Sequence, residues 1–136
     1  YLTSMIGLDK RWLEPYGIDP DTAFVALIPY SGQVVTHFER RRELGLPDTQ
    51  PLVDDMAPLS YVRPDCRPML ILSGDREREM LGRYEENAYF WRMMRVAGHP
   101  DVRICEFDGF DHGNMPQAGH FVAVRYIREM ERRMDR

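Results

Sequence analysis

The sequence predicts an α/β fold, a parallel three-layer α/β/α sheet with helices on both faces. The first observation is the run from Met69 to Gly74, which is apolar up to Leu72 without an alternating polar face. This pattern is typical of a strand that is buried on both sides of a parallel sheet. The second observation is the order strand, helix, strand, since a helical pattern over 82–97 is followed by a second strand over Val102 to Phe107. That order predicts a right-handed crossover between parallel neighbours.

Length and composition exclude several classes of protein. A chain of 136 residues fits one domain, and its formal charge of -4 gives no electrostatic reason to expect a nucleic-acid partner. No apolar run reaches the roughly 20 residues of a membrane span. Two cysteines without C-x-x-C spacing, and no histidine pair at ligand spacing, predict no metal site. The one basic run, Arg40 to Arg42, lies between Glu39 and Glu43 and is expected to be a solvated face.

The elements before the central strand follow from apolar runs and breakers. Tyr1 to Gly7 is small and apolar, which predicts a buried helix, and Ala23 to Ile28 is the expected first strand. From 33 to 58 the chain is irregular, apart from a short helix expected over Phe38 to Leu44. An excursion of this length between strands is typical of a lid or a substrate-side insertion.

Two helices are expected after the central strand. Gly82 to Ala97 has apolar residues at helical spacing and ends at Gly98 and Pro100. The final helix is expected over Gln117 to Arg136, and its apolar stripe predicts five inward residues: Phe121, Val124, Ile127, Met130 and Met134.

Each of the two buried strands leads into residues that can carry catalysis. The first empties into Gly-Asp-Arg-Glu-Arg-Glu over 74–79, and the second into a glycine-flanked loop that holds His112. Carboxyl ends of parallel strands meet at one edge of a sheet, so we expect an acid and His112 to lie together. A histidine activates a serine hydroxyl by taking its proton, and a carboxylate fixes the tautomer of that histidine. The sequence thus predicts two thirds of a serine hydrolase triad.

This order of acid, helix, strand and Gly-Phe-Asp-His-Gly resembles the carboxyl-terminal half of an α/β-hydrolase of the esterase and lipase type, from about Ala23 onward. The resemblance implies a cofactor-free, serine-dependent hydrolysis of small carboxylic esters. It also implies that residues 1–136 are part of one domain, whose upstream half supplies the nucleophile elbow Gly-x-Ser-x-Gly just before Tyr1. These 136 residues contain no such elbow and are expected to be inactive alone.

Two acids are candidates for the place beside His112. The family pattern Gly-x-x-Asp-x-x-apolar gives Gly74, then Glu77, and Glu77 is therefore the first choice. Asp75 is the alternative, although its short side chain could instead cap the following turn. Glu79 is expected to be solvated.

Ser31 also precedes the acid and the histidine in the chain order of a triad. Pro29 and Gln33 stand where an elbow has its glycines, which disfavours Ser31 as the nucleophile. Ser31, Gln33 and His37 are instead expected on the substrate side. Two other functions stay open: an amide or peptide hydrolase of the same fold, and a noncatalytic binding module that keeps the scaffold.

Overall fold

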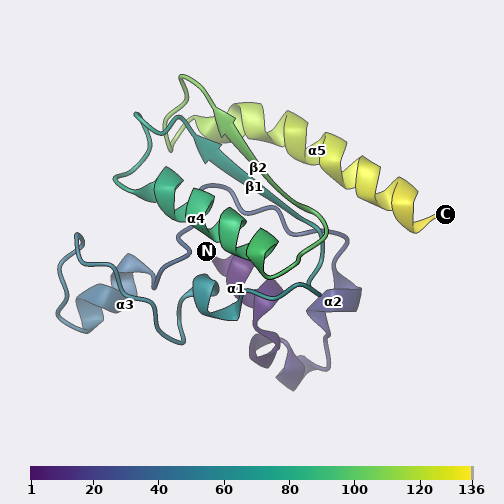
Figure 1. Cartoon of the computed structure of the whole chain (residues 1–136), viewed down its shortest axis with the longest axis horizontal. Coiled ribbons are helices and arrows are strands. Elements are labelled where there is room, and N and C mark those ends of the chain that lie inside the picture. Colours follow the sequence, from purple (N-terminus) through teal and green to yellow (C-terminus); the bar gives the residue numbers. More distant parts are fainter. Residues whose placement is uncertain (136) are drawn as a thin grey trace.

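The structure is a computed structural model that describes residues 1–135. Its sheet contains β1 (Met69–Gly74) and β2 (Val102–Phe107), which pair in parallel from Met69 opposite Val102 to Gly74 opposite Phe107. Helix α4 (Arg83–Val96) connects the strands, and α5 (Met115–Met134) follows them (Figure 1). The predicted parallel α/β arrangement is thus present in part, as a small two-stranded sheet with helices.

Both faces of β1 are covered, as its sequence predicts. Ile71 packs on the α4 side in a buried cluster with Phe90. Leu72, the next residue, points to the opposite face and packs with Ala123 and Met130 of α5. Because successive side chains of a strand alternate between faces, a continuous apolar run supplies both cores at once.

Helix α5 packs on the sheet through a stripe that the sequence did not predict. The expected inward residues Phe121, Val124, Ile127 and Met134 are exposed, and only Met130 is buried. A side chain at Gly119 would place its Cβ 2.8 Å from the Tyr30 ring, so the helix approaches closely at its small residues. Larger apolar residues are left on the outer face. The buried stripe is Met115, Gly119, Ala123, Tyr126 and Met130.

Within residues 1–135, no helix combines the length and apolar character of a membrane span.

The expected strand over Ala23 to Ile28 is wrong in its bounds. Ala23 ends the short helix α2 (Pro20–Ala23), and the segment after it pairs with β1 at two isolated parallel bridges. Leu27 pairs with Met69, and Tyr30 with Leu72. Pro29 lies between the two bridges and has no N–H to donate, which prevents a continuous ladder. The segment still runs parallel to β1, as predicted.

The remaining helices are short. They are α1 (Leu2–Leu8), α3 (Phe38–Glu43) and three turns of 3₁₀ helix at Lys10–Trp12, Glu14–Tyr16 and Pro58–Tyr61.

Helix α3 belongs to a loop that we call the α3 loop, residues 37–51. The base of this loop is closed where the Thr36 amide donates to the Leu52 carbonyl at 2.8 Å and the Thr36 hydroxyl donates to Asp54. Residues 37–51 therefore form a loop whose two ends are held close together.

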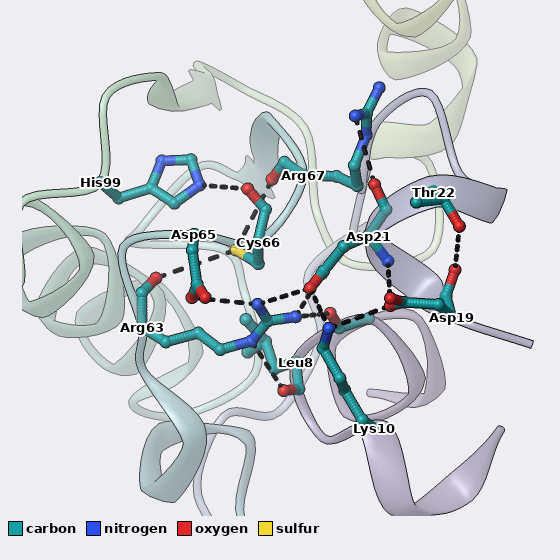
Figure 2. A network of polar contacts seen from close by, with 11 residues as sticks. Leu8, Lys10, Asp19, Asp21, Thr22, Arg63, Asp65, Cys66, Arg67 and His99 are labelled. Atoms are coloured by element: carbon teal, nitrogen blue, oxygen red, sulfur yellow. Dashed lines mark hydrogen bonds and ion pairs between the residues drawn. The ribbon is translucent and has the colours of Figure 1, made fainter. Parts of the chain in front are cut away.

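A polar network joins α1 and α2 at the end of the sheet where the strands begin (Figure 2). The Arg63 guanidinium donates to the carbonyls of Gly7 and Leu8 at 3.2 and 3.0 Å, at the carboxyl end of α1. It also pairs with Asp21, in the first turn of α2, at 3.0 Å. The pKa of Asp21 stays below its usual range, because its bonds to Arg63 and Lys10 outweigh the effect of burial.

Candidate active site

Two loops meet beyond the carboxyl ends of the strands: the acid loop (75–82) after β1 and the histidine loop (108–114) after β2. The Asp75 amide donates to the Phe110 carbonyl at 2.8 Å. The Asp75 carboxylate accepts from the Gly109 amide at 2.7 Å and from the Glu77 amide at 2.9 Å. These hydrogen bonds hold the pKa of Asp75 below its usual value, and the bond from the Gly109 amide has the largest effect. Asp75 therefore caps its turn and fastens the two loops together.

Glu79 is the acid that contacts the histidine. Its Oε2 lies 3.0 Å from Nδ1 of His112, and its side chain is 0% exposed, so the expectation that Glu79 is solvated is wrong. The Ser31 hydroxyl donates to Oε1 at 2.5 Å, and the Gly74 and Met80 amides donate to the carboxylate at 3.2 and 3.0 Å. Burial alone would raise the pKa of Glu79, but these bonds hold it below its usual value.

The turn that follows β1 explains why Glu77 does not take this place. The amides of Arg78 and Glu79 donate to the Asp75 carbonyl at 2.9 and 2.8 Å, which closes a turn over 75–79. Glu77 lies on the outside of this turn and is exposed, whereas Glu79 points back beneath Gly74. Neither expected acid, Glu77 or Asp75, contacts His112 among the described residues.

The contact with Glu79 fixes the tautomer of the neutral histidine. In the neutral imidazole, the proton on Nδ1 donates to the ionised carboxylate, and the lone pair is on Nε2. Nε2 has no hydrogen-bond partner within residues 1–135, and the side chain is 44% exposed. Asp111 shapes the loop, because its carboxylate accepts from the amides of Gly113 and Asn114.

Ser31 lies on the same side of the imidazole as Glu79. Its Oγ is 3.3 Å from Nδ1 of His112. With φ of 43°, Ser31 is the one non-glycine residue of the described chain in the left-handed region. Its backbone is held in place by the Leu72 carbonyl, 2.7 Å from its amide, and by Arg83, which donates to its carbonyl at 2.6 Å.

The beginning of α4 fixes the segment after Ser31 through side chains that the sequence did not single out. Asn87 donates to the Gly32 carbonyl at 2.9 Å. Glu86 accepts from the Val34 amide at 3.1 Å and pairs with Arg83 at 2.8 Å. Arg83 and Asn87 are buried, with 6% and 0% of their surface exposed. Glu86 and Asn87 follow Arg83 by three and four residues, a spacing that places the three side chains on one helix face. This spacing is the sequence signal that could have indicated the inner polar stripe.

A small cavity of about 240 Å³ collects the expected substrate-side residues around the histidine. Ser31, Gln33 and His37 line it together with His112. Tyr1 lines the same cavity, and its backbone passes so close to the Ser31 segment that a Cβ on Gly32 would lie 2.7 Å from the Tyr1 nitrogen.

Solved structures of one enzyme resemble this arrangement. The native structure of Thermogutta terrifontis esterase 2, a thermophilic esterase from a Planctomycetes species, superposes with a TM-score of 0.60 at 19% identity, over 85% of this chain and 45% of that chain. Its apo form gives 0.56 at 23% identity, over 77% and 42%. This chain shares the fold of part of an esterase.

The resemblance to an esterase that the motifs indicated is thus confirmed at the level of the fold. The form of that esterase that is phosphoramylated by tabun also matches, at 21% identity with a TM-score of 0.58. The chain spans less than half the length of the esterase structures it matches. No protein-family model and no curated protein matches the sequence.

Proposed function

We propose that this chain carries the general base and the acid of a serine-dependent carboxylic ester hydrolase. The observation that carries the proposal is the buried Glu79 carboxylate on Nδ1 of His112, with Nε2 left without a partner. In this mechanism Nε2 takes the proton of a serine hydroxyl as the oxygen attacks the ester carbonyl, and returns it to the departing alcohol. Glu79 stabilises the imidazolium that forms between these two steps.

The nucleophile of this proposal precedes Tyr1 in the chain. Tyr1 lines the cavity of His112, so residues joined to its amino end would enter the site close to the histidine. Ser31 is a poor candidate, because its hydroxyl already donates to Glu79 and lies at Nδ1, the nitrogen that the acid also occupies. In this reading Ser31 positions the acid, and residues 1–136 form the carboxyl-terminal part of one hydrolase domain.

The size of the cavity supports a short acyl group. About 240 Å³ accommodates a few carbon atoms beside the ester. Structures of the Thermogutta esterase contain bound propionate and butyrate. We therefore assign small aliphatic carboxylic esters as the substrate class.

The decisive experiment uses the intact protein, expressed with the coding sequence that precedes Tyr1. We expect hydrolysis of 4-nitrophenyl butyrate, and a fluorophosphonate probe should label a serine in a Gly-x-Ser-x-Gly sequence upstream of Tyr1. Residues 1–136 expressed alone should be neither labelled nor active, and addition of the upstream half as a separate chain should restore activity. Labelling of Ser31, or activity of residues 1–136 alone, would contradict the position of the nucleophile. Hydrolysis of the matched 4-nitroanilide at a comparable rate would instead favour an amide hydrolase.

A further inference from the structure

Arg41, in the middle of the basic run, is buried. The sequence predicted a solvated face for 40–42, but only 6% of the Arg41 surface is exposed. Its Nη1 donates to the carbonyls of Asp48 and Gln50, both at 2.8 Å, and so holds the α3 loop closed. Its Nε is buried and has no hydrogen-bond partner. One edge of the guanidinium therefore supports the loop, while the Nε edge is unused among the described residues.

The charges around Arg41 do not balance. Arg41 lines a crevice of about 410 Å³ between the α3 loop and the beginning of α4. Two arginines there are paired, Arg42 with Asp48 at 2.9 Å and Arg83 with Glu86 at 2.8 Å. Arg41 has no carboxylate partner within residues 1–135. A buried guanidinium that contacts no carboxylate is unfavourable, and an anionic ligand in the crevice would relieve that cost.

The crevice adjoins the cavity of His112. Both are lined by Gln33, Phe38, Met80 and Arg83. A group held by Arg41 can therefore belong to the same molecule whose ester bond lies at His112.

We propose that the crevice binds a carboxylate at the far end of the acyl chain, so that the preferred substrates are monoesters of aliphatic dicarboxylic acids. This inference rests on the proposed ester hydrolysis and narrows its substrate class. The Nε edge of a guanidinium forms two parallel hydrogen bonds with a carboxylate, a geometry that monodentate anions and neutral groups match less well. Phe38, Pro51 and Met80 in the crevice provide apolar contacts for the methylene groups between the two carboxyls.

The test compares matched esters on the intact protein. The 4-nitrophenyl monoesters of glutaric, adipic and suberic acid are measured against 4-nitrophenyl pentanoate, hexanoate and octanoate. We expect kcat/KM for the acid monoester to exceed that of its neutral match by about tenfold or more at one of these lengths, since charge-assisted hydrogen bonds have this magnitude. Arg41→Gln should remove the preference through KM and leave the neutral ester within about twofold.

Arg42→Gln is the matched control, because Arg42 lies next to Arg41 on α3, lines the same crevice and loses the same charge. It should keep the preference for the acid monoester. Arg41→Lys keeps the charge without the planar edge, so part of the preference should remain. An equal loss on both ester classes in Arg41→Gln would show that Arg41 only supports the α3 loop, and would overturn the inference.

Two further outcomes are decided by the unmodified protein. If Arg41→Gln does not fold, the wild-type ratio decides, and the absence of a preference at every length overturns the inference. If no ester is hydrolysed, the proposed function fails, and calorimetric titration with adipate decides the inference separately. Binding that Arg41→Lys weakens supports the carboxylate site, and the absence of binding to the wild type overturns it.

Discussion

The Glu79 carboxylate and the His112 imidazole, 3.0 Å apart, differ sharply in their surroundings. The side chain of Glu79 has no exposed surface, whereas that of His112 is 44% exposed. A fully bonded acid thus holds a partly exposed imidazole that lines the cavity and whose other nitrogen has no hydrogen-bond partner among the described residues. This asymmetry is what a general base requires, because the acid must be fixed before the reaction and Nε2 must reach the substrate.

Glu79→Gln should abolish ester hydrolysis in the intact protein, while Glu77→Gln should not. Each change removes one charge and keeps the shape of the side chain. We expect a drop in kcat of about 10³ to 10⁴ for Glu79→Gln, because the histidine loses its preferred tautomer and the support of its charged form. Glu77→Gln should stay within about twofold, since Glu77 is exposed. The reverse result in a 4-nitrophenyl acetate assay would show that Glu77, the acid that the family pattern predicts, supports the histidine.

His112→Ala should lower turnover of the same ester by about 10⁴ or more. Because the side chain is nearly half exposed, the urea midpoint of unfolding should change little. His120→Ala is the control, since His120 contacts Tyr30 at 3.1 Å and does not touch Glu79. Near-normal turnover of a folded His112→Ala protein would exclude His112 as the base.

The stability conferred by Glu79 should depend on pH in a defined direction. Its folded pKa is lowered, so the stabilisation is complete above the unfolded value of about 4.3 and is lost as pH falls through the folded pKa. The difference in free energy of unfolding between wild type and Glu79→Gln should therefore narrow as pH falls from about 6 to about 3. Urea titrations across this range measure it. A difference that does not change with pH would mean that the bonds to Glu79 do not favour its ionised form.

Arg63→Ala should destabilise the fold without touching the site. Arg63 is 18% exposed and bonds both the carboxyl end of α1 and Asp21, so its loss leaves carbonyls and a carboxylate without their donor. We expect a loss of about 2 kcal/mol or more in the free energy of unfolding. Asp65→Ala removes a partner that is 74% exposed and should leave the free energy of unfolding nearly unchanged. Equal effects of the two variants would show that the bonds of Arg63 to α1 and Asp21 contribute little.

The order of elements was predictable because it depends on local patterns. The continuous apolar run at β1 and the helical spacing of α4 each require burial on particular faces, and both are found where expected. The packing face of α5 was not predictable in this way. A count of apolar residues favours Phe121 and Val124, but the contact depends on how closely Gly119 lets the helix approach Tyr30.

The position of His112 beside the acid loop was predictable from its place after a strand, but the acid that contacts it was not. Three carboxylates follow β1 within five residues, and strand position alone does not say which one turns inward. The capping of its own turn by Asp75 decides the matter, since that turn carries Glu77 outward and Glu79 back beneath Gly74. Arg41 was mispredicted for a related reason. Its neighbours in sequence are solvated, and only the fold of the α3 loop reveals that one residue of the run is enclosed.

The bonds between Asp75 and the histidine loop also determine how this protein can be recombined with others. The Asp75 amide donates to the Phe110 carbonyl, and the Asp75 carboxylate accepts from the Gly109 amide. The conformation of each loop therefore depends on the other loop, and one loop transferred alone to another protein would lose these bonds. A chimera whose crossover point falls between 75 and 110 would combine an acid loop and a histidine loop that evolved in different proteins. Crossovers placed before β1 or within α5 would transfer both loops as one inherited unit.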